Sequence, residues 1–211
     1  MLRNQPEFVY AFAAHSQLEI EVAWNTCSTA WARPIFGLLC VRAYNDWMVD
    51  DWCAPSGGRL IPLIIVPLWD ADLAAQEVRR NADRDVRAVC FSEIPPFLGL
   101  PSIHDADGYW DPFFQACEET GTVICMHIGS SSKMPSTSAD APPAVGSTLT
   151  FANAAYSLVD WLMSGVFTRF PNLTIAYSEG QIGWMPYVLE RATTRTRTAP
   201  GLAPGRSPRS R

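Results

Sequence analysis

Short apolar runs alternate along the chain with longer stretches in which apolar residues recur at helical spacing. The apolar runs occupy residues 59–68, 85–93, 122–129 and 173–180. The first of them, RLIPLIIVPL, is apolar at nearly every position, which is typical of a strand in a parallel sheet that is covered on both faces. We therefore predict four buried strands.

Helical patterns fill the gaps between these runs. Residues 69–84 place apolar side chains at helical spacing behind an N-cap at Asp70 or Asp72. The remaining helical patterns cover residues 109–121, 150–171 and 183–192. Strands that alternate with helices predict a parallel α/β fold. Such folds place their ligands at the carboxyl ends of the strands, where the long loop over residues 130–147 begins.

The pattern divides the chain into three parts. Residues 1–37 show no clean period and form an atypical N-terminal segment, whereas residues 38–192 carry the α/β pattern. Residues 193–211 are poor in large apolar side chains and contain five arginines and no acid. A segment of that composition buries too little surface to order itself, so we predict a disordered basic tail.

Composition and charge exclude several classes of protein. The 211 residues are 48% hydrophobic and 18% charged, with a formal net charge of −5, which gives no reason to expect a nucleic-acid partner. The first twenty residues lack a continuous apolar core, and no apolar run is long enough to span a membrane. The six cysteines are scattered and contain no C-x-x-C pair. We expect reduced thiols and a cytoplasmic protein.

Polar side chains end each predicted strand. His127 ends the third strand, Glu93 the second and Glu179 the fourth, and Asp70 follows the first. An imidazole at a strand end can bind a metal, act as an acid or base, or simply bond to a neighbour. Helix capping explains Asp70 nearly as well. Alternation places Val123 and Cys125 on the same face as His127, and we expect Ile175 and Tyr177 to share this inward face.

Other chemistries find no support. The chain has no G-x-S-x-G, G-x-G-x-x-G or P-loop motif, which argues against a serine hydrolase and a nucleotide-binding protein. The two other histidines, His15 and His104, lie outside the predicted strands, and we expect both to be surface residues.

Several segments resemble the amidohydrolase-related family of the amidohydrolase superfamily, in the branch that includes aminocarboxymuconate-semialdehyde decarboxylase. They are YNDWMVDDWC, RLIPLIIVPLWD, AVCFSEIPPFLGLPSIHDADGYWDPFFQACEETGTVICMHIGSSS and FTRFPNLTIAYSEGQIGWMPYVLERA. The resemblance implies a (β/α)₈ TIM barrel with one divalent metal, usually zinc, at the strand ends. It also implies hydrolysis or non-oxidative decarboxylation of a small carboxylated or cyclic substrate.

The resemblance also assigns roles. His127 matches the metal-ligand histidine of the family's fifth strand. Glu179 stands where many members have a catalytic histidine in an H-G-G turn, although the turn here reads S-E-G-Q. Glu179 and Glu93 are therefore candidate catalytic residues, and His127 is the candidate metal ligand.

Two family motifs are absent from the sequence. It contains neither the H-x-H pair of the first strand nor the S-D-x-P-H motif of the eighth. We therefore expect a partial barrel, about strands three to six, that looks truncated at both ends and has lost its zinc or holds less than one equivalent. The alternative to an enzyme is a non-catalytic fragment that acts only through association with another chain, including self-association.

Overall fold

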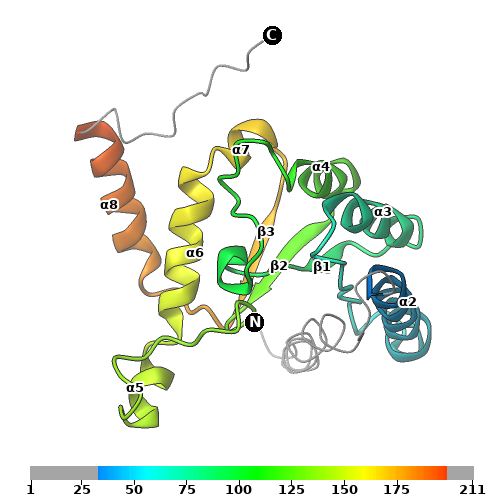
Figure 1. Cartoon of the computed structure of the whole chain (residues 1–211), viewed down its shortest axis with the longest axis horizontal. Helices are drawn as coiled ribbons and strands as arrows, with labels where there is room; N and C mark the ends of the chain where they lie inside the picture. The colour runs from blue at the N-terminus through cyan, green and yellow to red at the C-terminus, as the bar shows by residue number, and fades with distance from the viewer. Residues whose placement is uncertain (1–32, 199–211) are drawn as a thin grey trace, which may run out of the picture.

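The computed structural model describes residues 33–198, which form a small parallel sheet with helices packed on it (Figure 1). The sheet contains β1 (Ala88–Cys90), β2 (Val123–His127) and β3 (Ile175–Ser178), in that order. Both pairings are parallel. This is the predicted α/β class, and the predicted site residue His127 ends the central strand.

The predicted strand over residues 59–68 is reduced to a single bridge, so this prediction was wrong in extent. Ile64 pairs in parallel with Val89 of β1, and its neighbours form no regular strand. Pro62 and Pro67 lie on either side of Ile64 and have no backbone N–H to donate, which limits regular pairing to the residues between them.

A side chain occupies the backbone groups next to this bridge. Asn45 Nδ2 donates to the carbonyl of Ile65 at 2.9 Å, and the amide of Ile65 donates to Asn45 Oδ1 at 2.9 Å. A carboxamide can present a donor and an acceptor side by side, as a neighbouring strand would. Asn45 therefore ends the sheet at this edge.

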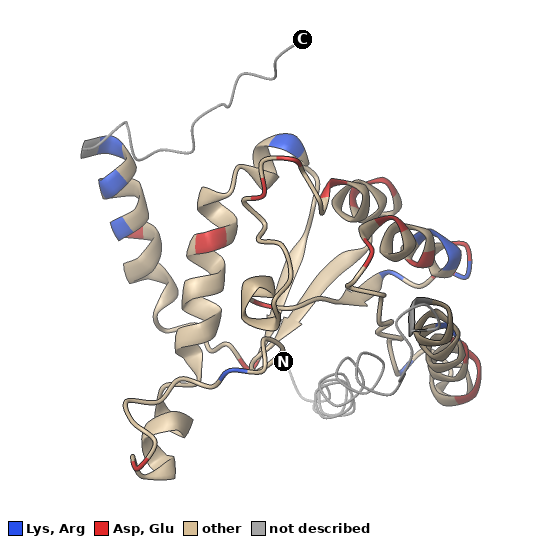
Figure 2. Cartoon of the chain, in the orientation of Figure 1, with Lys and Arg blue, Asp and Glu red and all other residues tan. Residues whose placement is uncertain are grey.

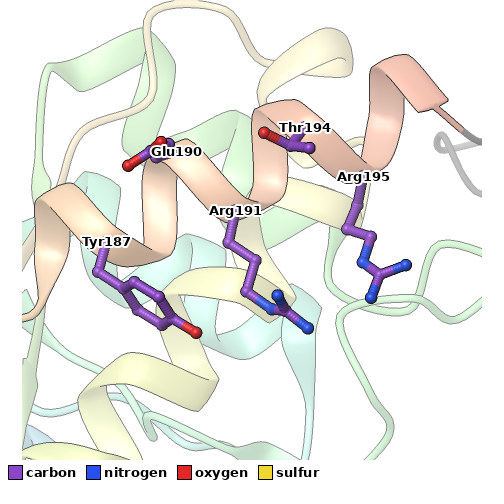
Figure 3. A pocket seen from close by; sticks show the side chains of 5 residues that line it. All are labelled: Tyr187, Glu190, Arg191, Thr194 and Arg195. Atoms are coloured by element: carbon purple, nitrogen blue, oxygen red, sulfur yellow. The ribbon is translucent and has the colours of Figure 1, made fainter.

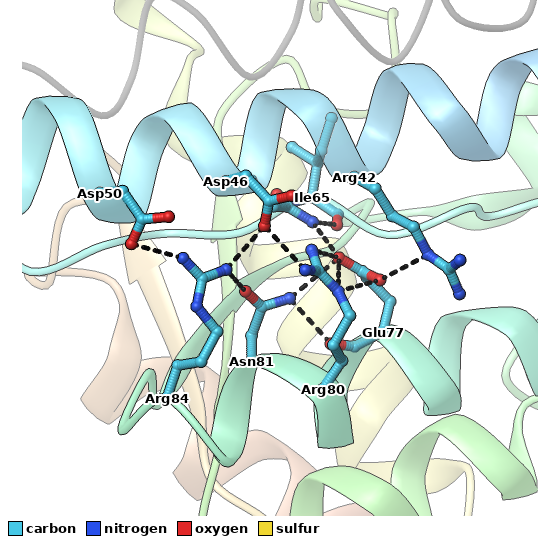
Figure 4. A network of polar contacts seen from close by, with 9 residues as sticks. Arg42, Asp46, Asp50, Ile65, Glu77, Arg80, Asn81 and Arg84 are labelled. Atoms are coloured by element: carbon cyan, nitrogen blue, oxygen red, sulfur yellow. Dashed lines mark hydrogen bonds and ion pairs between the residues drawn. The ribbon is translucent and has the colours of Figure 1, made fainter.

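Asn45 belongs to α2 (Arg33–Asp46), which continues into the π-helix η1 (Trp47–Cys53) and the short 3₁₀-helix η2 (Ala54–Ser56). A polar network joins α2 to α3 (Ala71–Ala82) (Figure 4). At its centre the fully buried Glu77 carboxylate accepts from Asn45 at 2.8 Å and from Arg80 at 2.6 Å. The hydrogen bond from Arg80 is also the main reason that the pKa of Asp46 is lowered.

Helices connect the strands as the pattern predicts, with two differences. After η3 (Pro95–Leu98), α4 (Asp111–Thr120) leads from β1 to β2. The predicted helix over residues 150–171 is two helices, α6 (Phe151–Met163) and α7 (Val166–Arg169), because Gly165 between them adopts a φ of 75°. The predicted irregular loop contains α5 (Pro143–Thr148).

The last helix, α8 (Met185–Thr198), extends past the predicted start of the disordered tail at Thr193. That boundary was wrong. The hydroxyls of Thr193 and Thr196 donate to carbonyls four residues earlier, and two arginines lie in the last turn, where the helix dipole favours cations. The rest of the predicted tail, residues 199–211, lies outside the described residues, as does most of the predicted N-terminal segment.

The main core lies between the sheet and the helices α3, α4 and α6. Ile124 and Met126 of β2 are buried in it, together with an aromatic cluster. Phe91 stacks on Phe113 with ring centroids 5.1 Å apart and meets Trp110 edge to face at 4.9 Å. This face of the sheet is therefore rigidly supported beneath the strand ends.

The pairing register shows which side chains share this covered face. Ile124 pairs with Ile175 and Met126 with Tyr177, so Ile175 and Tyr177 point toward the helices. The prediction that they face inward with His127 was wrong. It used the alternation of side chains within each strand, but not the register that pairs β2 with β3. The inner face instead carries Val123, Cys125, His127, Ala176 and Ser178.

Two further observations concern the cysteines and the lengths of the helices. The five cysteines within residues 33–198 form no disulfide with one another, and four of these are buried or half-buried. Cys27 lies outside the described residues. None of the helices in the described part of the chain has the length and hydrophobicity needed to cross a membrane.

Candidate functional site

The carboxyl ends of the three strands meet along one edge of the sheet, which we call the carboxyl edge. His127 ends β2 and pairs with Ser178, the last residue of β3, so Glu179 follows directly beside it. Glu93 follows β1 three residues after Cys90. The structure therefore brings the three predicted site residues to one edge.

The ring of His127 is held in one tautomer by its own backbone. Its Nδ1 lies 2.6 Å from the carbonyl oxygen of Ile128, which can only accept, so Nδ1 carries the hydrogen. In the neutral ring, Nε2 then presents a lone pair. Nε2 is buried and has no hydrogen-bond partner within residues 33–198; Oε2 of Glu179 lies 3.5 Å away. Histidines that ligate metals commonly donate their other ring N–H to a carbonyl or carboxylate in this way.

Glu179 reaches His127 from a strained turn. Its φ is 57°, in the left-handed region that side chains other than glycine rarely adopt, and its side chain is half-exposed. The next residue, Gly180, packs closely on α6: a Cβ there would lie 2.8 Å from Cβ of Ala154. A side chain at position 180 would therefore clash with α6, and glycine lets the turn lie against this helix.

Glu93 is almost completely buried, with 1% of its surface exposed. Its Oε1 accepts three hydrogen bonds, from the amide of Gly129 at 3.1 Å, the hydroxyl of Ser131 at 3.1 Å and Nδ2 of Asn153 at 2.9 Å. Its Oε2 is buried and has no partner in the described part of the chain. One carboxylate thus ties β1 to the loop after β2 and to α6.

Burial raises the pKa of Glu93 above its ordinary value. The hydrogen bonds from Asn153, Ser131 and Gly129, and the nearby charge of His127, act in the opposite direction and offset part of this effect. A carboxyl with a raised pKa and one free oxygen can hold a proton at Oε2.

The other polar residues named from the sequence lie outside this group of three. Asp70 caps α3 by accepting from the amide of Leu73 at 2.9 Å, as the capping alternative predicted. His104 is exposed and pairs with Asp160 of α6 at 2.6 Å, which confirms it as a surface residue. His15 lies outside the described residues.

Sequence reasoning missed the groups that hold Glu93 in place. Besides Ser131 and Asn153, Ser157 of α6 donates to the Glu93 carbonyl at 2.6 Å, and the hydroxyl of Tyr177 donates to Ser157 at 2.8 Å. A usable signal existed, because Asn153 and Ser157 are polar residues four apart on an otherwise apolar helix face.

The donors of the carboxyl edge fall short of a complete metal site. Within residues 33–198, no three His, Cys, Asp or Glu side chains are grouped so that they could hold a metal ion. Catalytic zinc takes three protein ligands. His127 with Glu179 supplies two donor atoms, so the remaining donors would have to come from outside the described residues.

The cavity shown in Figure 3 lies away from these residues. It has a volume of about 350 Å³ and is lined by Tyr187, Glu190, Arg191, Thr194 and Arg195, all of α8. None of its lining residues follows a strand of the sheet, so it is not part of the candidate site.

The sequence profile of the amidohydrolase family matches residues 29–206, which is most of the chain. This chain belongs to the amidohydrolase family. The expected family is therefore confirmed, and the small parallel sheet with its helices is consistent with part of a barrel.

Solved amidohydrolase structures share this fold. An amidohydrolase from Mycobacterium avium subsp. paratuberculosis K-10 is 24% identical and has a TM-score of 0.61; the match covers 81% of this chain and 45% of that one. The 2,6-dihydroxybenzoate decarboxylase from Rhizobium is 21% identical, with a TM-score of 0.55 and coverage of 83% and 54%.

A third neighbour contains a metal. The 5-carboxyvanillate decarboxylase from Novosphingobium aromaticivorans was solved with manganese and 3-methoxy-4-hydroxy-5-nitrobenzoic acid; it is 19% identical, with a TM-score of 0.57 and coverage of 77% and 45%. The chain thus spans about half the length of these structures. A comparison with curated proteins gave no match.

Proposed function

We propose that this chain forms part of a metal-dependent hydrolase or non-oxidative decarboxylase that acts on a small carboxylated or cyclic substrate. The proposal rests on family membership and on one observation: the buried Nε2 of His127, aimed by the Nδ1 bond to Ile128, at the carboxyl end of the central strand. Two of the solved neighbours are decarboxylases of carboxylated aromatic compounds, which supports this substrate class.

In this proposal His127 is a metal ligand and Glu179 is the acid or base beside it. The 3.5 Å between His127 Nε2 and Glu179 Oε2 supports a shared role at one site. Glu93 shapes the site by holding the loop after β2, and its free Oε2 is a second position for a proton. Because the described donors do not complete a metal site, we derive no reaction step through the metal.

Metal analysis tests the proposal. We expect the purified chain to keep less than one equivalent of zinc after dialysis, because the described donors are too few. Zinc or manganese added back should bind, and His127→Ala should weaken that binding at least about tenfold, the order seen when a metal site loses supporting groups. His104→Ala is the matched control and should bind as the wild type does. Metal binding that His127→Ala leaves unchanged would contradict the proposal.

A non-catalytic chain that acts by association with another chain is the second candidate. It is supported by the incomplete donor set within residues 33–198 and by the exposed Ala176 on the inner face of the sheet. Metal-dependent turnover of a carboxylated substrate by the purified chain would exclude it.

A further inference from the structure

The segments that follow the strands at the carboxyl edge are short of positive charge. Residues 91–110, 128–150 and 179–184 contain a single basic side chain, Lys133, which is also the only lysine of the chain. Figure 2 shows arginine on α3, α7 and α8 instead. The same segments contain several acids, Glu93 and Glu179 among them. A negatively charged ligand at this edge is therefore repelled by most protein charges there.

Lys133 is held at this edge by contacts on both its backbone and its side chain. Its carbonyl accepts from Nδ2 of Asn153 at 2.5 Å, the same nitrogen that donates to Glu93. Its Nζ lies 4.4 Å from the ring centroid of Phe97, in η3 just after Glu93. A cation over an aromatic face is attracted to it, so this contact favours one position of the ammonium beside Phe97.

The Lys133 ammonium is exposed and makes no ion pair with any carboxylate of the described residues. Most other basic groups in the fold are neutralised; Arg80, for example, pairs with Asp46 and Glu77. An exposed, positioned and unneutralised ammonium keeps its charge available for a ligand. Phe97, which is 40% exposed, offers apolar surface beside it.

We infer that Lys133 is a specificity-determining residue that binds the carboxylate of an aromatic or cyclic substrate at the carboxyl edge. This inference rests on the proposed function and narrows its substrate class to anions. Lys133 supplies the only Lys or Arg side chain of the three segments that follow the strands at this edge, and Phe97 beside it would contact the ring of the ligand. Neutral cyclic compounds lack the group that Lys133 recognises.

Matched ligands and matched variants test this role. The probes are 2,6-dihydroxybenzoate and resorcinol, which differ only in the carboxylate, and binding to the full chain is measured by calorimetry with and without manganese. We expect wild type to prefer the carboxylate. Lys133→Gln should weaken 2,6-dihydroxybenzoate binding about tenfold, as expected for one lost charged contact, and leave resorcinol binding unchanged. Lys133→Arg should keep most of the preference.

Arg191→Gln is the control, because it removes the same charge from an exposed position on α8. Equal affinity of wild type for both probes, or an unchanged carboxylate preference in Lys133→Gln, would overturn the inference. A change in the resorcinol affinity of Lys133→Gln would also overturn it, because it would reveal a structural role. The proposed function is tested separately. If His127→Ala binds metal as tightly as the wild type, the proposed function is contradicted, even if the carboxylate preference depends on Lys133.

Discussion

Burial and hydrogen bonding act on Glu93 in opposite directions, and burial dominates, so its pKa is raised in the folded chain. Over the range between the unfolded and folded pKa, the folded chain holds a proton that the unfolded chain has released. The free energy of unfolding therefore falls as the pH rises from about 4.3, the ordinary glutamate value, through the folded pKa. Below that range the contribution is fully present.

Glu93→Gln removes this titration while keeping an acceptor for Gly129, Ser131 and Asn153. We expect the unfolding free energy of wild type to decrease relative to that of Glu93→Gln as the pH rises above about 4.3. Urea denaturation at a series of pH values measures the difference. Glu179→Gln, at the half-exposed neighbouring position, is the control. A difference between wild type and Glu93→Gln that is constant with pH would show that Glu93 does not titrate abnormally.

Site residues could be predicted from the sequence where their position depends only on neighbouring residues in the chain. His127 was found because alternation along β2 fixes the last residue of the strand, and Asp70 because a cap needs only its own helix. The partners of Glu93 could not be found in this way. Ser131, Asn153 and Ser157 come from positions 38 to 64 residues further along the chain, and only tertiary packing brings them together.

At the outer edge of the sheet, the secondary structure also depends on a contact that is distant in the sequence. The apolar run over residues 59–68 predicts a full strand, yet only Ile64 pairs with β1. Asn45, which is fully buried, bonds both backbone groups of Ile65 and also donates to Glu77 of α3. A residue twenty positions away thus replaces a strand, and no periodicity in the run itself reveals it.

Asn45→Ala should therefore loosen this edge. It removes the partner of both the amide and the carbonyl of Ile65, and one of the donors to Glu77, in a buried setting. We expect a loss of about 2–3 kcal/mol in the free energy of unfolding. Chemical denaturation measures this loss, and hydrogen exchange at Ile65 should accelerate. Asn172→Ala, an exposed position of the same residue type, should change stability little. Equal stability of Asn45→Ala and wild type would mean that water satisfies these groups.

The two faces of the sheet are covered unequally. The helix-covered face buries Ile124 and Met126 almost completely, whereas Val123 and Cys125 on the inner face are half-buried and Ala176 is exposed. A second, small cluster of Val41, Ile65 and Cys90, with its neighbours, covers the inner face only at the β1 end. The partial-barrel prediction implies this unequal cover of the two faces. It does not predict that α2 covers the β1 end of the inner face, because the helical pattern before residue 40 is weak.

We predict that the chain self-associates through this inner face. At about 25 cal/mol per Å² of apolar surface removed from water, a few hundred Å² would contribute several kcal/mol, comparable with the whole stability of a domain. The unfolding temperature should therefore rise with protein concentration, and sedimentation should show a reversible oligomer. Ala176→Glu places a charge on this face and should shift the equilibrium to the monomer.

Ala144→Glu, at an exposed alanine of α5, is the matched control and should leave association unchanged. The comparison separates an effect of the inner face from a general effect of added negative charge on solubility. A sharp unfolding transition that does not depend on concentration, from a monomer, would contradict the prediction. It would mean that the inner face needs no second chain to cover it, because stable monomers commonly expose a patch of a few hundred Å².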